Sequence, residues 1–333
     1  MNSGNHGEPM DTRAHQQAYD AKYAGDYMDA DAYSTWVHGG LAAQRVRQTL
    51  QQVPVVPARI LDYGCGQGKW VGLLRSLYPQ ADIRGIDVSA VAIDKARKKH
   101  PDCRFLPFDG GRAPFDDAGF DLVFSFHVLE HVLDFAASVE DIARLVRPGG
   151  FACIIFPCGN VDSYEERLAS LIKDGRQTSA TGETIFFFER SEGHLRRVES
   201  ASTISLFEQH GLTMTIEFYS GHFYASLDWL IRGTGPHYIN AMFRGMTPAS
   251  RYAALKLKLM HRLLLGSNRM LGYQHLDLKR TRQPLKQFLA RLVRAAATRA
   301  DRALLGLARQ EWERRRKVKS GSVQYIIFQK RPA

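Results

Sequence analysis

A short stretch near the first predicted strand combines a carboxylate with closely spaced glycines. Asp62 ends an apolar run, and Gly64, Gly66 and Gly68 follow it at alternate positions. A strand that runs into a glycine turn and then a helix brings main-chain N–H groups and a helix N-terminus against a ligand. Glycine has no Cβ atom, so a ligand can approach such a backbone closely. The stretch therefore predicts a binding site for a small molecule.

The glycine spacing excludes two common nucleotide-binding motifs. A dinucleotide-binding turn has the pattern GxGxxG, which requires glycine at position 69, where this chain has Lys69. A Walker-type phosphate loop requires the sequence GK[ST], and Trp70 follows the lysine here. The ligand of this turn is thus expected to belong to another class.

Histidine and glutamate side chains form a second candidate site. His127, Glu130 and His131 stand at positions n, n+3 and n+4, which brings three side chains to one side where a strand leads into a helix. His194 lies further along, in the sequence EGHLRRV. Imidazole and carboxylate groups serve as general bases and as metal ligands. Metal binding, metal-free base catalysis by His131 or His194, and purely structural roles all remain open.

The elements that position these residues alternate between apolar runs and helical patterns. Strands are expected at ARILDY, IRGIDV, CRFLPF, FDLVFSF and FACIIFP, and helices at KWVGLLRSLYP, AVAIDKARKKH and SVEDIARLV. Continuous apolar strands separated by helices predict a parallel sheet covered on both faces, which is a doubly wound α/β domain. Ligands of such sheets bind at the carboxyl ends of the strands.

Five segments of this region resemble the motifs of class I S-adenosylmethionine-dependent methyltransferases. They are Asp62 to Gly68, Gly85-Ile86-Asp87, Asp109-Gly110 with the following Pro114-Phe115 and Phe120 to Val123, His127 to Val132, and Arg147-Pro148-Gly149-Gly150. The resemblance implies a seven-stranded Rossmann-like sheet and S-adenosyl-L-methionine as the cofactor. It implies that Asp87 accepts both ribose hydroxyls and that Asp109 accepts the adenine amino group.

The same resemblance implies the rest of the cofactor site. Backbone N–H groups around Gly64 to Gly66 suit the carboxylate of the cofactor, and Asp62 or a nearby carbonyl offsets its ammonium group. The further cofactor-binding residues implied are Cys65, Gly68, Val88, Gly110 and Phe126.

The histidine and glutamate residues are similar to a metal-binding pattern of some relatives. Ubiquinone-pathway O-methyltransferases and small-RNA terminal 2′-O-methyltransferases hold a divalent metal with ExxEH and a distant His. The resemblance implies His127, Glu130, His131 and His194 as ligands of Mg, Mn, Zn or Fe. This chain has His127 where those families have Glu, and fewer oxygen ligands weaken selection for Mg. Glu-His also occurs in relatives without metal, where it orients a helix or acts as a base.

The predicted core is flanked by other segments. Residues 1–55 are expected to form an N-terminal helical lid, helical over 14–50, with Tyr19, Tyr23 and Tyr27 on one face that either caps a pocket or packs. The core is expected over 56–220, a basic helical insertion over 221–320 and the last core strand over 321–333. Phe186, Phe187 and Phe188 are candidates to wall the acceptor site, with ordinary core packing as the alternative.

Positive charge is concentrated at the end of the chain. From Arg251 onward 21 Lys/Arg face 4 Asp/Glu, giving +17, so residues 1–250 carry 24 minus 30, or −6. One segment there has an apolar face, made by Leu285, Phe288, Leu289, Leu292, Val293, Ala296, Ala300, Ala303, Leu304 and Leu307, with Lys and Arg between them. A membrane surface, RNA and packing on the core remain open as its partner. Trp312 beside Arg314 to Lys317 favours the membrane over nucleic acid.

Composition limits the class of protein. No apolar stretch approaches the roughly 20 residues of a membrane span, and the polar start lacks a secretion signal. The four cysteines show no CxxC pairing. We expect a cytoplasmic protein, peripheral at the inner face of the membrane, that O-methylates a small-molecule or lipid-linked acceptor such as a quinone precursor or a glycolipid sugar. The alternatives are RNA 2′-O-methylation and a non-catalytic scaffold. The oligomeric state is not predicted.

Overall fold

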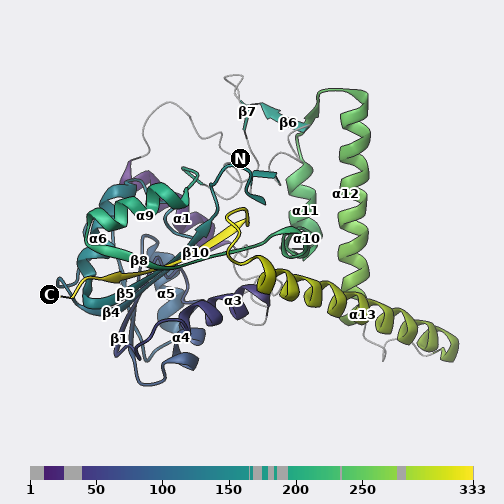
Figure 1. Ribbon diagram of the computed structural model, residues 1–333. Helices are drawn as coiled ribbons and strands as arrows, with labels where there is room; N and C mark the ends of the chain where they lie inside the picture. Colours follow the sequence, from purple (N-terminus) through teal and green to yellow (C-terminus); the bar gives the residue numbers. More distant parts are fainter. Residues whose placement is uncertain are drawn as a thin grey trace. The chain divides into compact units, whose positions relative to one another are not determined.

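The computed structural model describes residues 11–25, 40–164, 166–167, 175–178, 184–185, 194–232, 235–275 and 283–332. The chain divides into two compact units (Figure 1). The first comprises Met1–Pro157, Leu195–Glu217 and Tyr325–Ala333, and the second comprises Cys158–His194 and Phe218–Gln324. The second unit therefore takes in residues 158–194 in addition to the predicted insertion.

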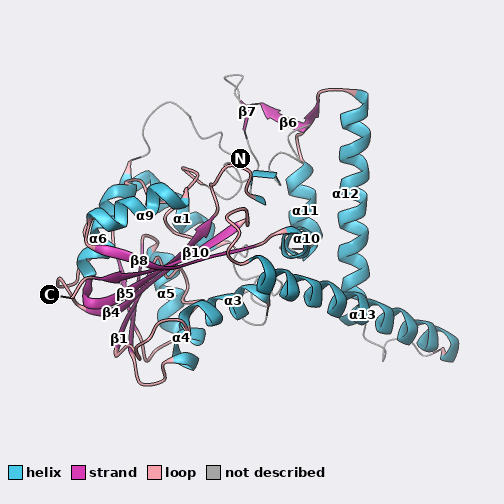
Figure 2. Cartoon of the chain, in the orientation of Figure 1, coloured by secondary structure: helices cyan, strands magenta, loops and turns pink. Residues whose placement is uncertain are grey.

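The first unit is built on a seven-stranded sheet, drawn in magenta in Figure 2. The order of its strands is β3-β2-β1-β4-β5-β10-β8. The strands are β1 Arg59–Tyr63, β2 Asp82–Asp87, β3 Arg104–Pro107, β4 Phe120–Phe126, β5 Val146–Pro157, β8 Leu212–Ser220 and β10 Val323–Lys330. Parallel pairing joins β1 to β2 and β4, β2 to β3, and β4 to β5. The predicted doubly wound α/β fold is confirmed, and β10 lies within the segment 321–333 that was expected to hold the last core strand.

Helices cover both faces of this sheet. They are α1 Thr12–Ala24, α3 Leu41–Leu50, α4 Val71–Leu77, α5 Ala90–Lys99, α6 Phe135–Leu145 and α9 Ser200–Gln209. In Figure 1, α3 and α4 lie on one side of the strands, and α6 and α9 lie on the other. Every residue of β4 is buried, which explains the mainly apolar run FDLVFSF. The segment expected to be helical over 14–50 contains α1 and α3, while 26–39 lies outside the described residues.

The second unit is mainly helical where the structure describes it. It contains α10 Phe223–Arg232, α11 Pro236–Phe243, α12 Arg251–Gly272, the short helix η2 Tyr273–His275 and α13 Pro284–Arg315, with a small sheet of β6 Gly175–Thr178, β7 Thr184–Ile185 and β9 Thr247–Pro248. Its apolar core includes Leu230, Ile239, Met242, Leu264 and Leu271. The unit thus has a core of its own, as expected for an independently packed insertion.

A half-buried ion pair network joins two helices of this unit. Arg232 on α10 contacts Asp228 at 2.6 Å and also forms an ion pair with Asp301 on α13. Glu311, near the end of α13, accepts hydrogen bonds from the backbone nitrogens of Phe223 and Tyr224 at 2.9 and 3.0 Å. These contacts hold the first turn of α10 against α13 and supply acceptors for its N–H groups.

Trp312 does not have the surface position that the sequence interpretation gave it. Its side chain is only 3% exposed and packs edge-to-face on Phe218 with 5.8 Å between the ring centroids. The predicted apolar face of α13 is mostly exposed: its large side chains from Leu285 to Val293 are exposed, and of its members only Ala300 and Leu304 are half-buried and pack against the core of the unit. Trp312 therefore gives no support to a membrane contact, because a packing partner inside the unit accounts for it.

Candidate active site

The glycine turn between β1 and α4 is held by backbone geometry. Gly64, Gly66 and Gly68 have φ values of +76°, +52° and +72°, a left-handed conformation that favours glycine. The amide nitrogens of Gly64 and Cys65 both donate to the Ile86 carbonyl, at 2.9 and 2.8 Å. The turn is thereby fixed to the end of β2, which carries Asp87.

The sides on which these glycines lack a Cβ atom face other parts of the protein. A Cβ on Gly64 would lie 2.2 Å from Val128, and one on Gly66 would lie 2.5 Å from the Tyr23 hydroxyl. A Cβ on Gly68 would lie 2.9 Å from the ring of His100. The expectation that these bare sides admit a ligand is therefore wrong. The glycines serve the turn conformation and the close packing of neighbouring elements.

Two buried carboxylates lie at the carboxyl ends of β1 and β2. Asp87 is 6% exposed; its Oδ2 accepts from the Gly66 amide at 2.7 Å and its Oδ1 from the Ser89 amide at 2.9 Å. Asp62 is 1% exposed, and its Oδ2 has no hydrogen-bond partner among the described residues. Both acids thus lie at the end of the sheet where the sequence analysis expects the cofactor, and their contacts to it stay predictions.

The electrostatics of this pair favour a bound cation. Burial raises the pKa of Asp62 to about 8, and the charge of Asp87 adds to the effect. Burial also raises the pKa of Asp87 to about 6, although the amide donors Ser89 and Gly66 oppose it. Two carboxyl groups that are buried close together disfavour each other's ionised form. A positive charge between them favours the ionised form of both. The donor set therefore fits the ammonium and sulfonium groups of S-adenosyl-L-methionine.

Helix α1 covers the turn and the end of β2. Asp20 Oδ1 accepts from the Ser89 hydroxyl at 2.6 Å, directly after Asp87, and the Tyr23 hydroxyl lies against Gly66. Sequence reasoning placed Tyr23 on the correct helix face but missed Asp20. An isolated Asp inside a helical pattern gives no signal of a contact 69 residues away.

The same helix reaches the turn that follows β4. His15 Nε2 donates to the carbonyl oxygen of His131 at 2.9 Å, and the rings of Tyr19 and His131 meet edge-on at 5.9 Å. Burial lowers the pKa of His15. These contacts place the neutral imidazole of His15 and the phenol of Tyr19 beside the second candidate site, which the sequence did not predict for His15.

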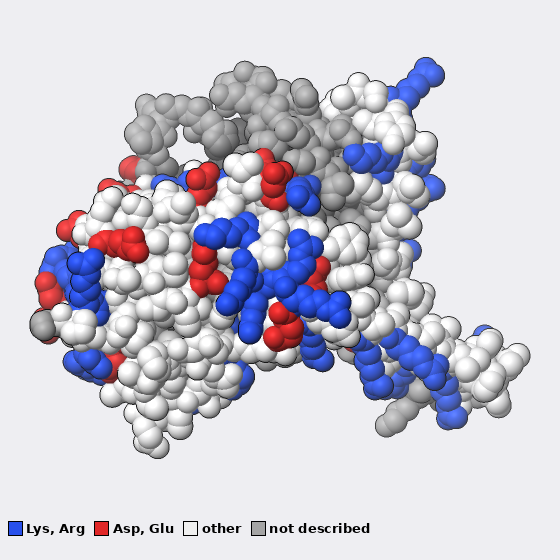
Figure 3. All heavy atoms as spheres, in the orientation of Figure 1, with Lys and Arg blue, Asp and Glu red and all other residues white. Residues whose placement is uncertain are grey.

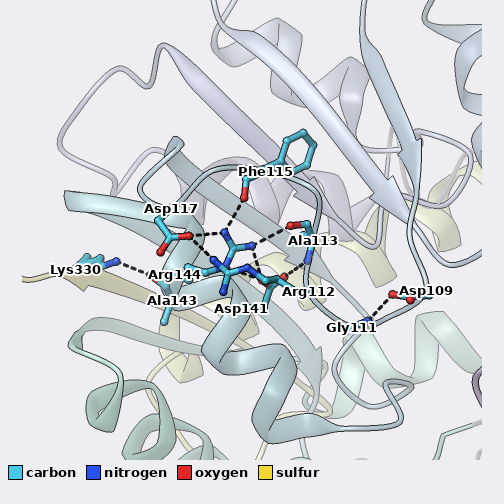
Figure 4. A network of polar contacts seen from close by, with 10 residues as sticks. All are labelled: Asp109, Gly111, Arg112, Ala113, Phe115, Asp117, Asp141, Ala143, Arg144 and Lys330. Atoms are coloured by element: carbon cyan, nitrogen blue, oxygen red, sulfur yellow. Dashed lines mark hydrogen bonds and ion pairs between the residues drawn. The ribbon is translucent and has the colours of Figure 1, made fainter.

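An arginine organises the loop that carries Asp109 and Gly110 (Figure 4). The guanidinium of Arg144 on α6 donates to the carbonyl oxygens of Ala113 and Phe115 at 3.0 and 2.7 Å. It also pairs with Asp117 at 2.9 Å and with Asp141 at 2.6 Å. Asp109 is exposed, and its Oδ1 accepts from the Gly111 amide at 3.0 Å. Arg144 thus fixes the conformation of the loop. The expected hydrogen bond from the adenine amino group to Asp109 stays a prediction.

Three other predicted cofactor residues line the same strand ends. Cys65 is buried, with its sulfur against Gly85, where a Cβ would lie 2.8 Å from that sulfur. Val88 is half-buried beyond the end of β2. Phe126 is buried at the end of β4 and packs on Trp70 at 4.4 Å. Their contacts to a cofactor stay predictions.

The segment after β4 is a turn rather than the expected helix start. His127 has φ +55°, the His131 amide donates to the Val128 carbonyl at 2.8 Å, and helix α6 begins only at Phe135 with Asp134 as its N-cap. The turn still brings the predicted side chains together. His127 Nδ1 lies 3.1 Å and His131 Nε2 3.8 Å from Oε1 of Glu130, whose carboxylate is buried.

This arrangement suits either a base or a metal ligand set. The Glu130 carboxylate lies close to the rings of His127 and His131, where it can orient a base or serve as a ligand beside them. The ligand set of His127, Glu130, His131 and His194 therefore stays a hypothesis.

A later segment is tied to the same turn. The Leu195 amide donates to the Glu130 carbonyl at 2.9 Å, and the Arg196 guanidinium donates to the carbonyl oxygens of Val132 and of Leu133, the latter at 3.0 Å. His194 is the covalent neighbour of Leu195 and the last residue of that stretch of the second unit. Arg196 was missed by sequence reasoning, and it stabilises the turn that carries Glu130 and His131.

Some predictions lie elsewhere. Tyr27 and Phe186 to Phe188 are outside the described residues. A cavity of about 420 Å³ lies between Phe135 and helix α9, lined by Arg196, Arg197 and Gln209 among others. None of the predicted site residues lines this cavity, so it belongs to neither candidate site.

Comparisons with known proteins find a methyltransferase family and relatives named methyltransferases. Residues 61–154 match the protein family described as "Methyltransferase domain". The malonyl-[acyl-carrier protein] O-methyltransferase of Legionella pneumophila is 34% identical over 125 residues, which are 37% of this chain and 43% of that protein. The trans-aconitate 2-methyltransferase of Azoarcus sp. is 29% identical over 213 residues, 61% of this chain and 79% of that protein. With other curated relatives the match covers less than half of their length.

A solved structure of a TehB-like SAM-dependent methyltransferase from Corynebacterium glutamicum is also similar, with 20% identity and a TM-score of 0.41. The similarity covers 61% of this chain and 88% of that one.

Proposed function

We propose that this chain, which carries a methyltransferase domain of the class I S-adenosylmethionine-dependent family, methylates an oxygen atom of a small-molecule or lipid-linked acceptor. A quinone precursor and a glycolipid sugar are the acceptors that we favour. One observation carries the cofactor part of the proposal: Asp62 and Asp87 are buried together beside a glycine turn, and burial raises the pKa of both carboxyl groups. Relatives named O-methyltransferases support the reaction class.

The chemistry is an in-line displacement. Bound S-adenosyl-L-methionine supplies a methyl group on a sulfonium, from which a neutral thioether departs. The bond from the methyl carbon to sulfur breaks as the bond to the acceptor oxygen forms, and a hydroxyl acceptor gives its proton to a base. The protein therefore has to align the partners, exclude water and accept one proton.

The residues after β4 suit the proton transfer. His131 is half-buried, and its Nε2 is 3.8 Å from Glu130 Oε1. A carboxylate at this distance favours the imidazolium that forms when His131 takes a proton. Arg196 and Leu195 hold the backbone of the turn in place. We assign the base to His131, with His194 as the second candidate.

Substitution of the histidines tests this assignment. In His131→Ala, turnover is expected to fall by about 100-fold or more, since general bases contribute on that order. Cofactor affinity, measured by calorimetry, is expected to stay within about twofold, because Asp62 and Asp87 are untouched. His194→Ala tests the second candidate by the same two measurements. Equal loss of cofactor binding and turnover in His131→Ala would contradict the division between binding and catalysis. His237→Ala, in the second unit, is the matched control.

Metal dependence is the other part of the hypothesis. If His131 acts as a metal-free base, treatment with a chelator is expected to leave turnover unchanged. Loss of turnover that returns on addition of Mg, Mn, Zn or Fe would instead establish the metal reading of Glu130 and its neighbouring histidines. Binding of the metal alone, followed by calorimetry, gives a readout that does not depend on activity.

The alternative functions differ in measurable ways. A non-catalytic scaffold predicts no heat of binding on titration with S-adenosyl-L-methionine. RNA 2′-O-methylation predicts a salt-sensitive gel shift with RNA, which the positive charge beyond Arg251 permits. A small-molecule enzyme predicts cofactor binding without a gel shift.

A further inference from the structure

Helix α12 has two apolar faces, only one of which the second unit uses. Ala253, Leu257, Leu264 and Leu271 are buried and pack in the core of the unit. A second set of large apolar side chains is exposed. We call it the α12 stripe, and it consists of Tyr252, Leu255, Leu259, Leu263 and Met270, with exposed fractions from 44% to 77%.

The stripe is narrow. At 3.6 residues per turn its members fall within an arc of about 80° that points away from the buried face. Gly266 lies in the same arc, between Leu263 and Met270. Scattered exposed leucines are ordinary in proteins, but a row of large apolar side chains along a 22-residue helix marks an interaction surface.

The charge beside the stripe is of one sign. Helix α12 carries Arg251, Lys256, Lys258, Arg262 and Arg269 and contains no Asp or Glu. At 100° per residue, all of these except Lys256 lie along one edge of the stripe. Figure 3 shows basic side chains along α12 and along the outer part of α13 on the face that is drawn.

The first half of α13 repeats this combination. Leu285, Phe288, Leu289 and Leu292 are 51% to 71% exposed. The basic residues of the same half are Lys286, Arg291 and Arg294. Both helices belong to the second unit, so one unit presents two apolar rows accompanied by cations.

We propose that the α12 stripe binds the surface of an anionic phospholipid bilayer. Its large apolar side chains would enter the boundary between headgroups and acyl chains, while the flanking arginines and lysines meet lipid phosphates. No helix of the described part of the chain is long and apolar enough to cross a bilayer, so this contact is peripheral.

The other occupants fit less well. RNA phosphates require the cations but leave a row of leucines without a function. A second copy of this chain, packed through the same stripe, would bring two rows of Arg and Lys together in a symmetric contact, and like charges oppose this. The inference deepens the proposed function, since a surface-bound enzyme meets a lipid-linked acceptor. Membrane binding itself does not depend on methyl transfer.

Vesicle flotation of the full chain tests the proposal. The probes are phosphatidylcholine vesicles with and without phosphatidylglycerol. We expect the chain to float with the anionic vesicles only, and the double variant Leu259→Ser with Leu263→Ser to bind at least about tenfold more weakly. Val161→Ser is the matched control, because Val161 is an exposed apolar residue of the same unit, at 77%, outside both helices. The control is expected to bind like the wild type.

A second variant and a spectroscopic readout separate the outcomes. Lys258→Gln with Arg262→Gln is expected to remove most of the salt-sensitive part of vesicle binding. Leu263→Trp is expected to show a blue-shifted emission with anionic vesicles and quenching by brominated lipid. Equal vesicle binding by the wild type and the Leu259→Ser, Leu263→Ser variant would overturn the proposal. So would an RNA gel shift, or a dimer seen by light scattering, that this variant abolishes while vesicles are not bound.

Cofactor calorimetry on the same variants keeps the two proposals distinct. Heat of S-adenosyl-L-methionine binding is expected to be unchanged in every α12 variant, because the glycine turn belongs to the first unit. Absence of that heat in the wild type would remove the proposed function and leave the membrane result intact. Absence of flotation would remove only the membrane inference.

Discussion

Replacing Asp87 by alanine is expected to weaken S-adenosyl-L-methionine binding by at least about 100-fold, measured by calorimetry. Hydrogen bonds to a charged acceptor contribute about 1.5–3 kcal/mol each, and two ribose hydroxyls would lose such a partner. The change also releases the Gly66 and Ser89 amides, which Asp87 now accepts at 2.7 and 2.9 Å. Both effects act in the same direction, since the glycine turn loses one of its links to β2 and keeps those to the Ile86 carbonyl.

Two variants bracket this result. Asp109→Ala removes one expected hydrogen bond to adenine from an exposed side chain and is expected to cost about tenfold. Asp94→Ala changes an exposed carboxylate on α5 that pairs only with Arg97 in the described structure and is expected to bind like the wild type. If Asp87→Ala bound S-adenosyl-L-methionine with an affinity within threefold of the wild type, and its unfolding transition were unchanged, the proposed cofactor site would be wrong.

Replacing Asp62 by asparagine is expected to stabilise the cofactor-free protein at neutral pH and to impair cofactor binding. In the folded protein the pKa of Asp62 is raised to about 8, whereas an unfolded chain has a value near 3.8. Between these values the unfolded state releases the proton and the folded state keeps it. The wild type therefore loses stability as pH rises from about 4 to about 8. Asparagine is neutral in both states and avoids this loss.

Denaturant titrations at several pH values measure the effect. The gain in unfolding free energy of Asp62→Asn is expected to be near zero at pH 4 and to grow to about 5 kcal/mol at pH 8, because each unit of pKa difference is worth about 1.4 kcal/mol. A gain that is independent of pH would contradict the assignment. Proton release on cofactor binding gives a second test. In the wild type at pH 7, binding of the cationic cofactor is expected to release protons from the buried carboxyl groups. Calorimetry in buffers of different ionisation enthalpy detects this release.

The fold could be predicted because its signals are local. The run FDLVFSF reads as a buried central strand, and β4 is buried at every residue. The positions of Asp62 and Asp87 followed equally, because each comes at the carboxyl end of a parallel strand and neighbouring strands bring such ends together. Neither inference needed a contact between distant parts of the chain.

The parts that could not be predicted depend on distant partners. His15 meets His131 across 116 residues of sequence, and no local pattern marks either for the other. Trp312 followed by basic residues has the composition of a membrane-interface segment, yet Phe218 buries it. The sequence predicts a helix start at His127, where the structure has a turn. The left-handed φ of +55° at this residue cannot be predicted from the residue types around it.

The α12 stripe illustrates a third difficulty. A helix with apolar side chains on two opposite faces gives no single amphipathic signal, so the sequence reads as generally hydrophobic. Only the burial of Leu257 and Leu264, against the exposure of Leu259 and Leu263, separates the two faces. In α13 the predicted apolar face is exposed from Leu285 to Val293, and of its members only Ala300 and Leu304 pack on the core of the unit.

The ends of the insertion are close together. β8 and β10 are neighbours in the sheet, and just beyond them the Ser322 amide donates to the Gly221 carbonyl at 3.1 Å. About a hundred residues are thus inserted between two strands that are neighbours in the sheet. Evolution could lengthen, shorten or replace the inserted segment without changing the order of the strands in the sheet. A chimera joined at Gly221 and Ser322 would transfer the inserted segment as one unit.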